Sequence, residues 1–355
     1  MRVSSEAGTA SPGAEETLRK GLQDLVWHLG RKVCRQGRGN DTLERDGELL
    51  RAFLRSFEVL GDVRGLADCY YHLGNIAYIR SDLDAAAEQY RRCLTLLEQA
   101  GDRPGFARAC HQLGMVAQKT GDHAGAVSWY CRSIELSTAA RDAVAVAQTS
   151  HQLGNVFCLQ GGFEDARTCY GVSLELSELH GDAAGVARSY YQLALIAEAR
   201  GDEGMAGELY EAGRSIAEPA GAAAEAVRCL QRLGRLAERA GDRTTALTCF
   251  KSALALADET ALEDQAVTAA SAIGALYTQM GEAEQGLDYT LKSTGARLAA
   301  GAPPNRTDAA NLRRQHGALG PSRFRRLVSN RLHREHALAI LALVAESSAI
   351  AAGSG

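Results

Sequence analysis

Two consecutive stretches of the chain carry nearly the same pattern. Residues 101–140 read GDRPGFARACHQLGMVAQKTGDHAGAVSWYCRSIELSTAA, and residues 141–180 read RDAVAVAQTSHQLGNVFCLQGGFEDARTCYGVSLELSELH. Both contain His-Gln-Leu-Gly in the first half, and both place Ala and Tyr four residues apart in the second half. A fixed period of this kind is typical of repeat architectures, in which each unit stacks on its neighbours.

The same period continues on both sides of this stretch without a gap. It divides residues 61–300 into six blocks of 40 residues, which start at Gly61, Gly101, Arg141, Gly181, Gly221 and Ala261. Gly-Asp or a variant of it opens most blocks, and a second such pair follows in the middle, as at Gly121-Asp122. Because Gly favours helix ends and Asp favours helix starts, each block predicts two helices of roughly 15 to 17 residues.

Small and aromatic residues recur at fixed positions of these helices. A mid-helix Gly costs about 1 kcal/mol relative to Ala, so a register of small residues predicts the close approach of another helix. An aromatic ring from the second helix is suited to fill the space that Gly leaves. The small residues are Gly74, Gly114, Gly154, Ala194, Gly234 and Gly274, and the second helices carry Ala or Gly and then Tyr90, Tyr130, Tyr170, Tyr210 or Phe250.

Leu-Gly in the first helix, with Ala and an aromatic residue four apart in the second, resembles the tetratricopeptide repeat. The usual period of that family is about 34 residues, whereas this chain resembles the longer-helix variants of kinesin light chains and of bacterial peptide-sensing and signalling arrays. The resemblance covers residues 61 to about 300. It implies an all-α fold, a right-handed superhelical solenoid of helix-turn-helix repeats with terminal capping helices.

The segments outside the repeats predict the rest of the domain organisation. Residues 1–18 are expected to be a disordered N-terminal segment, and residues 19–60 a diverged repeat or N-terminal cap. The six repeats at 61–300 are followed by a linker at 301–307, where Pro303 and Pro304 break the pattern. Residues 308–347 are expected to form a basic pair of capping helices, and residues 348–355 a disordered tail.

The distribution of charge limits the classes of partner, and the cysteines indicate the cellular compartment. The net charge is −4, yet residues 301–355 hold eight arginines against three acidic residues, which leaves the first 300 residues near −9. Nucleic acid is therefore an unlikely partner, since its affinity depends on clustered basic residues. The sequence leaves open whether the basic helices are only a cap or also serve as a docking site. Nine scattered cysteines without a CxxC pair, and the lack of a signal peptide or long apolar run, predict a soluble cytoplasmic protein.

One stripe of each first helix avoids the core positions. The resemblance implies that this stripe lines the concave groove of the solenoid, and its Tyr, His, Asn and Arg side chains are types that favour recognition. The predicted groove residues are Asp68, Tyr71, Asn75 and Tyr78, then Arg108, His111 and Gln118, then Gln148, His151 and Asn155, then Arg188 and Tyr191, and finally Arg228, Gln231 and Arg235.

Two features of the stripe suggest what a ligand offers. The amides of Asn75 and Asn155 suit the backbone of an extended peptide, although they equally suit a solvated face. Arg108, Arg188 and Arg228 occupy one column, which suits acidic side chains or a C-terminal carboxylate. The alternative is that these arginines pair with neighbours such as Glu198 or Glu238.

These observations predict a non-catalytic module, an adaptor, scaffold or sensor, that binds a protein or peptide in the groove. The sequence contains no phosphate-binding, dinucleotide-binding or nucleophile-elbow motif. His111 and His151 share a column but lack a third ligand for zinc, so no metal or other cofactor is expected. The alternative is an enzyme on the same scaffold that acts on a small molecule through His111, His151 and Tyr191.

Overall fold

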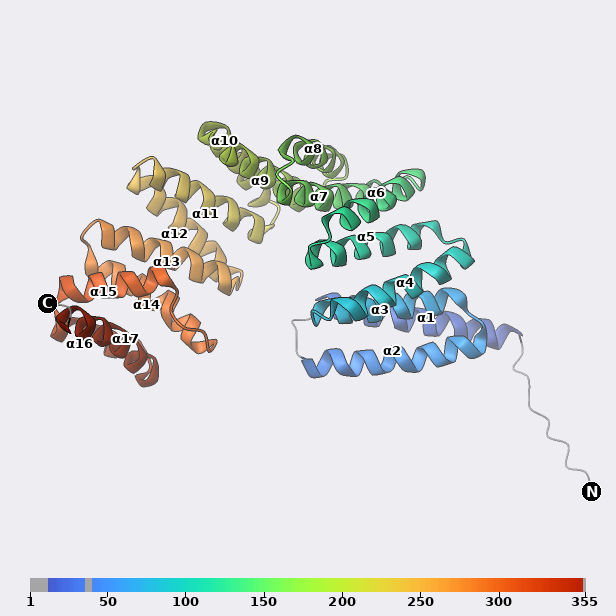
Figure 1. Cartoon of the computed structure of the whole chain (residues 1–355), viewed down its shortest axis with the longest axis horizontal. Coiled ribbons are helices and arrows are strands. Elements are labelled where there is room, and N and C mark those ends of the chain that lie inside the picture. The colour runs from blue at the N-terminus through green and yellow to red at the C-terminus, as the bar shows by residue number, and fades with distance from the viewer. Residues whose placement is uncertain (1–11, 36–39, 354–355) are drawn as a thin grey trace, which may run out of the picture. The chain divides into compact units, whose positions relative to one another are not determined.

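The computed structural model describes residues 12–35 and 40–353, and these contain seventeen helices and no strand, so the predicted all-α class is confirmed. The helices fall into two compact units, which divide between residues 180 and 181 (Figure 1). The first unit holds α1 (Pro12–Arg35), α2 (Asn40–Leu60), α3 (Val63–Ile79), α4 (Leu83–Ala100), α5 (Arg103–Thr120), α6 (His123–Ala139), α7 (Ala143–Leu159) and α8 (Phe163–Leu179).

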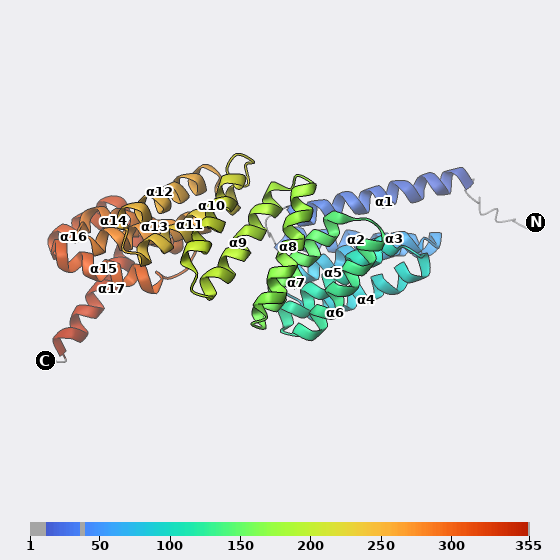
Figure 2. The same cartoon turned by 90° about the horizontal axis from the view of Figure 1, so that it is seen from above.

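The second unit continues the pairs and adds three further helices. Within each unit, every pair of helices stacks on the next (Figure 2). The six predicted repeats are therefore the six pairs from α3/α4 to α13/α14. The helices of the second unit are α9 (Ala183–Ala199), α10 (Glu203–Ala217), α11 (Ala223–Arg239), α12 (Arg243–Glu259), α13 (Glu263–Gln279), α14 (Ala283–Ala299), α15 (Arg306–Leu319), α16 (Pro321–Arg331) and α17 (Arg334–Gly353).

Turn chemistry sets the helix ends as predicted. Asp122, for example, accepts a hydrogen bond of 2.9 Å from the backbone N–H of Gly125 and so caps α6. Gly121, just before it, has a φ of 82°, in the left-handed region that favours glycine. Three turns of the same kind place Ser81, Arg141 and Ala261 in that region, with φ between 55° and 62°.

We expect Arg141→Gly to stabilise the protein by about 0.5 to 1 kcal/mol, because a left-handed conformation costs a residue with a Cβ about 1 to 2 kcal/mol. The neighbouring Ala140, with a φ of −81°, provides the matched control. Ala140→Gly adds only freedom to the unfolded chain and is expected to destabilise the protein. Urea unfolding followed by circular dichroism measures both. If both substitutions shift the free energy of unfolding in the same direction, Arg141 is not strained.

Small residues and rings meet between the helices of a repeat, as the columns predict. A Cβ placed on Gly74, Gly114 or Gly154 would lie 2.5 to 2.7 Å from a ring carbon of Tyr90, Tyr130 or Tyr170, respectively. These three tyrosines and Tyr210 are completely buried. The sixth repeat has Thr290 at this position, and Gln315 of α15 donates a hydrogen bond of 3.0 Å to its hydroxyl. The capping helix thus contacts the position from which the aromatic side chain is missing.

Both ends of the chain differ in detail from the expectation. Helix α1 begins at Pro12, inside the segment expected to be disordered, while residues 1–11 lie outside the described residues. Three helices stand where a capping pair was expected, because Gly320, with a φ of 75°, and Pro321 separate α15 from α16. Helix α15 begins at Arg306, inside the expected linker, and α17 continues to Gly353, inside the expected tail.

The capping helices cover part of the core of the last repeat. Leu287 and Leu291 of α14 are buried in one cluster with Leu312, Phe324 and Ile340. Tyr289 of α14 belongs to the preceding cluster, where its ring stacks on that of Tyr277 at 5.8 Å. Among the described residues, no helix combines the length and apolarity needed to cross a membrane.

Candidate functional site

A cavity of about 420 Å³ opens between the first helices of the first unit. We call it the His72 cavity, because His72 is its most buried polar residue. Tyr71, Asn75 and Tyr78 of the predicted groove line it, so the structure brings these three together around one concavity. The complete lining is Trp27, Gly30 and Arg31 from α1, then Tyr71, His72, Asn75, Tyr78 and Ile79 from α3, and Gln112 from α5.

Sequence reasoning missed the contribution of α1 to this cavity. Residues 27–31 read Trp-His-Leu-Gly-Arg and correspond to Tyr-His-Leu-Gly-Asn at residues 71–75. The offset is 44 residues instead of 40, so a fixed cut of the sequence does not align the two. The shared His-Leu-Gly is the signal that places Trp27 on the same helix face as Tyr71.

His72 packs closely against the rings and backbone around it. Its ring centre lies 5.5 Å from that of Trp27 and 5.4 Å from that of Tyr71, edge-on to both. A Cβ on Gly30 would lie 2.0 Å from the imidazole Cε1, so only glycine leaves room for this ring. The His72 imidazole therefore packs against Gly30 of α1 in the way that a tyrosine ring packs against the corresponding glycine in the regular repeats.

The imidazole of His72 carries unused hydrogen-bonding capacity. Its side chain is 3% exposed, and within the described part of the chain neither ring nitrogen has a hydrogen-bond partner. Burial, with a smaller contribution from Arg108, lowers its pKa to about 4. At neutral pH the ring is therefore uncharged, with one nitrogen able to donate and the other able to accept. Such a group departs from the rule that buried polar atoms have hydrogen-bond partners.

Cations surround the aromatic rim of the cavity. The Arg108 guanidinium lies 5.0 Å from the Trp27 ring centre, and the Lys119 amine lies 4.6 Å from that of Tyr78. Arg31 lines the cavity itself. Burial raises the pKa of nearby Asp68 to about 6, although Arg108 and a hydrogen bond from Trp27 oppose that shift. The rim thus combines three cations with Asp68, and Asp62 and Asp102 lie close enough to Asp68 to raise its pKa further.

Several side chains of the first-helix stripe, both in the cavity and beyond it, have a structural role that the sequence did not reveal. Buried tyrosines of the second helices donate their hydroxyl protons to stripe side chains of the first helices. The donor and acceptor pairs are Tyr90 with Asn75 at 2.8 Å, Tyr130 with Gln118 at 3.0 Å, Tyr170 with Asn155 at 2.7 Å, and Tyr210 with Glu198 at 2.5 Å. Asn155 also donates to Gln152 at 3.0 Å, so its amide is engaged on both sides.

Asn155→Ala is therefore expected to cost about 1 kcal/mol of stability, because the buried hydroxyl of Tyr170 loses its oxygen acceptor. Gln148→Ala is the matched control on the same helix, since Gln148 is exposed, and it should change stability by less than about 0.5 kcal/mol. Thermal unfolding of the two variants is the measurement, and indistinguishable melting temperatures would refute the structural role.

The two stripe histidines of the first unit are packed against core tyrosines. His111 lies 5.6 Å from the Tyr130 ring centre, and His151 lies 5.2 Å from that of Tyr170. The His111 Nδ1 is 2.9 Å from the Thr149 hydroxyl, and burial lowers the His111 pKa to about 4. His111 is thus a neutral, hydrogen-bonded ring at physiological pH. Tyr191, the third member of the enzyme alternative, belongs to the second unit and packs on Tyr210.

The arginine column of the second unit is compensated by acidic residues of the same unit. Arg188 and Arg228 both contact the Glu225 carboxylate, at 3.5 and 3.2 Å. Arg188 also lies 3.6 Å from Asp182. The sequence suggested Glu198 or Glu238 as partners, but Glu198 pairs with other arginines of its own unit, Arg232 and Arg239. The remaining stripe residues are Gln231, which donates to the Gln265 carbonyl at 2.9 Å, and Arg235, which is exposed.

The basic capping helices contact acidic residues of α14. Arg323 pairs with Glu284, and Arg331 lies 2.5 Å from Asp288. Part of the basic surface therefore serves the attachment of the cap, which is one of the roles left open by the sequence.

Part of the chain matches a known family of helical repeats. Residues 65–139, 106–179 and 145–218 each match the family model described as tetratricopeptide repeat. No curated protein matches the sequence. Similar solved structures include the apo form of RapI, at 12% identity and a TM-score of 0.58 over 79% of this chain and 98% of that one.

Two further solved structures have comparable folds. BtubC from P. vanneervenii is 21% identical, with a TM-score of 0.53 over 65% of this chain and 92% of that one. A Rap protein complexed with Competence and Sporulation Factor is 14% identical, with a TM-score of 0.52 over 96% of this chain and 95% of that one. At these identities the likeness concerns the fold.

Proposed function

We propose that this chain, whose residues 65–218 match the family model of the tetratricopeptide repeat, is a non-catalytic module that binds a protein or peptide segment on the first-helix face of its first unit. The observation that carries the proposal is the His72 cavity, in which a buried imidazole has no hydrogen-bond partner among the described residues beneath an aromatic and cationic rim. A Rap protein of this fold was solved in complex with Competence and Sporulation Factor, so such a scaffold is able to hold a ligand.

The chemistry of the cavity defines the segment that it would take. Trp27, Tyr71 and Tyr78 offer ring faces and edges, which suit an aromatic side chain. A polar atom on that side chain, such as the hydroxyl of tyrosine, would bond to the imidazole of His72. Arg31 and Arg108 would pair with acidic residues beside it or with a C-terminal carboxylate. The preferred ligand is therefore a peptide with a tyrosine next to acidic groups.

The other residues of the predicted groove are expected to contribute to binding in different ways. Gln148 and Arg108 are exposed and free to extend the contact along α5 and α7. Asn75 and Asn155 already accept from core tyrosines and are assigned a supporting role. An enzymatic role is not proposed, because His111 is neutral and bonded to Thr149, which leaves it poorly placed as a base.

A peptide library provides the test, because the chain contains a fluorescent reporter in the cavity. Its two tryptophans are Trp27 and Trp129, so Trp129→Phe leaves Trp27 as the single emitter. Peptides selected from a random displayed library on the full chain should shift the emission of Trp27. We expect enrichment of tyrosine with acidic neighbours, and a loss of affinity of about tenfold or more in Arg108→Ala.

Matched variants separate binding from folding. Arg108 is exposed, so Arg108→Ala should keep the melting temperature while it weakens binding. Arg91→Ala on the second helix α4, also exposed, removes the same charge elsewhere and should bind normally. The proposal fails if selected peptides leave Trp27 emission unchanged, or if Arg108→Ala and Arg91→Ala bind them equally well.

A further inference from the structure

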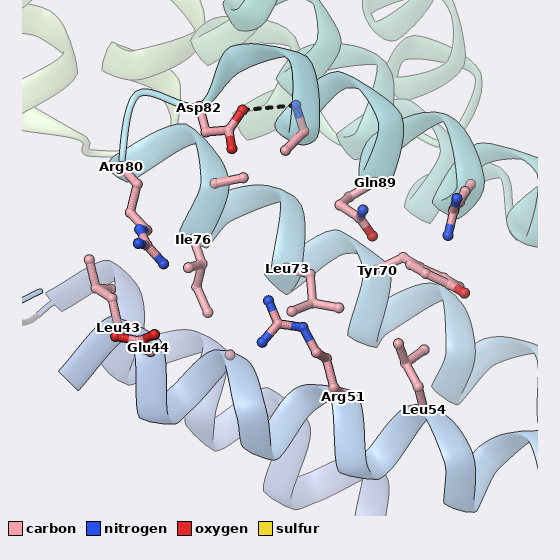
Figure 3. A pocket seen from close by; sticks show the side chains of 14 residues that line it. Leu43, Glu44, Arg51, Leu54, Tyr70, Leu73, Ile76, Arg80, Asp82 and Gln89 are labelled. Atoms are coloured by element: carbon pink, nitrogen blue, oxygen red, sulfur yellow. Dashed lines mark hydrogen bonds between the residues drawn. The ribbon is translucent and has the colours of Figure 1, made fainter. Parts of the chain in front are cut away.

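A second cavity in the first unit, of about 590 Å³, lies between α2, α3 and α4 (Figure 3). We call it the α2 cleft. It shares no lining residue with the His72 cavity. Its lining consists of Leu43, Glu44, Gly47, Arg51 and Leu54 from α2, then Tyr70, Leu73, Ile76, Ala77 and Arg80 from α3 and its C-cap, and Asp82, Ala85, Gln89 and Arg92 from α4 and its N-cap.

The next repeat shows why the α2 cleft is open. Forty residues after Gln89, at the corresponding position of α6, the chain has Trp129. Trp129 is partly buried and packs against the apolar clusters on both sides of it. Gln89 offers no such bulk, and Gly47 of α2 offers no side chain at all. The space that a tryptophan occupies in one repeat is thus available to a ligand in the preceding one.

The floor of the cleft is apolar. Leu73 and Ile76 of α3 are buried, at 9% and 6% exposure. Leu54 of α2 and the Tyr70 ring continue this surface toward one end (Figure 3). Arg92 lies 5.8 Å from the Tyr70 ring centre and pairs with Glu88 at 2.8 Å, so it is already engaged.

Two arginines of the lining bring positive charge to the cleft. The Arg51 guanidinium lies beside Leu73 in the middle of the cleft, and the Arg80 guanidinium extends from the end of α3 on the side of Leu43 and Glu44 (Figure 3). In the part of the chain that the structure describes, neither forms an ion pair with a carboxylate. Asp82 is engaged as the N-cap of α4, where it accepts from the Ala85 N–H, which leaves Glu44 as the acid nearby. Two guanidiniums without a carboxylate partner beside one acid attract an anion.

We propose that the α2 cleft binds an amphiphile with one carboxylate and an acyl chain. The carboxylate lies between Arg51 and Arg80, and the chain runs over Leu73 toward Tyr70. The α-helical rise gives about 15 Å between the levels of Arg80 and Tyr70 on α3, which suits a medium-length fatty acid. The volume lies in the range of small-molecule sites, which is about 300 to 1,000 Å³.

An extended peptide fits the α2 cleft less well than an acyl chain. Its buried backbone N–H and C=O groups would each need a partner. The middle of the cleft offers them the aliphatic side chains of Leu54, Leu73 and Ile76 instead. An acyl chain has no such requirement, and its single polar group would pair with Arg51 and Arg80.

Dodecanoate, used with the full chain below its micelle concentration, is the probe. We expect saturable binding by calorimetry, weakened about tenfold or more by Arg51→Ala or Arg80→Ala. Gln89→Trp should abolish binding while the melting temperature stays the same or rises, because the added ring fills the cleft as Trp129 fills the next one. Arg55→Ala, an exposed change on α2 outside the lining, should bind like the wild type.

The uncharged analogue dodecanol tests the role of the carboxylate and should bind at least about tenfold more weakly than dodecanoate. The proposal is overturned if dodecanoate does not bind, if Gln89→Trp binds it like the wild type, or if dodecanol binds equally well. Emission of Trp27 in the Trp129→Phe background should not respond to dodecanoate. A response there would place the amphiphile in the His72 cavity instead, and would also refute the assignment to the α2 cleft.

Discussion

Gly114→Ala is expected to destabilise the first unit by about 2 to 3 kcal/mol, although alanine is the better helix former. The new Cβ would lie 2.5 Å from Cε1 and 2.6 Å from Cδ1 of the Tyr130 ring. That ring has no room to retreat, because it is completely buried and its hydroxyl is held by Gln118 at 3.0 Å. Overpacking must therefore be relieved by movement of α5 against α6.

A second glycine supplies the control for this prediction. Gly171 lies inside α8, and a Cβ added there meets nothing within 4 Å. Gly171→Ala should stabilise the protein by up to about 1 kcal/mol through helix propensity alone. The same Gly→Ala substitution at two positions of one unit is thus expected to change the free energy of unfolding in opposite directions. Urea unfolding with circular dichroism measures both, and a stable Gly114→Ala would show that the ring does not depend on the glycine.

A double variant isolates the contact between the two residues. Tyr130→Leu removes the ring atoms that the new Cβ would meet, at the cost of a smaller core side chain. Gly114→Ala combined with Tyr130→Leu should therefore be less destabilising than the sum of the two single changes. Strict additivity would mean that the clash is relieved elsewhere in the structure.

The repeat architecture was predictable because it depends on local, periodic features. Glycine and aspartate mark helix ends through backbone conformation and capping, and the Gly114 and Tyr130 columns report a contact that recurs every 40 residues. Each of these features is repeated along the chain, so the pattern identifies it without knowledge of the fold.

The candidate site was less predictable, because it arises where the repetition fails. Trp27 enters the His72 cavity from a helix whose spacing departs by four residues from the period. The α2 cleft exists because Gln89 is smaller than the Trp129 that replaces it in the next repeat. The stripe asparagines, in turn, were predicted from their position, whereas the bond from Tyr170 to Asn155 is visible only once the second helix is packed.

The polar contacts that dock the first capping helix were not predicted from the sequence. The buried face of α15 consists of Asp308, Asn311, Leu312 and Gln315. The Asp308 carboxylate accepts from Ser271 at 2.6 Å and from Ser293 at 2.7 Å. A hydrophobic pattern cannot reveal such a contact, since the serine partners of Asp308 lie 37 and 15 residues away in the sequence.

Asp308→Ala is expected to cost about 2 to 4 kcal/mol, because two buried hydroxyls lose their acceptor and the cap loses its polar contact with α13 and α14. Asn305 also donates to Asp308, at 3.0 Å, and would lose this bond. Asp308→Asn keeps the shape and one acceptor oxygen and should cost less. Thermal unfolding, with limited proteolysis of the C-terminal helices as a second readout, measures both changes, and equal costs would contradict the role of the carboxylate oxygens.

The pH dependence of the stability of the wild type and of Asp308→Asn tests whether Asp308 is charged in the folded protein. Burial raises its pKa above the ordinary value of 3.8, although Ser271, Ser293 and Arg297 oppose the shift. The folded state therefore holds this proton more tightly than the unfolded state, and the resulting stability is fully present below about pH 3.8 and is lost as pH rises through the folded pKa. The neutral Asn side chain of Asp308→Asn lacks this dependence. The advantage of the wild type over Asp308→Asn should thus shrink as pH rises above about 4, and an advantage that grows with pH would mean that the hydrogen bonds to the carboxylate outweigh the cost of burying its charge.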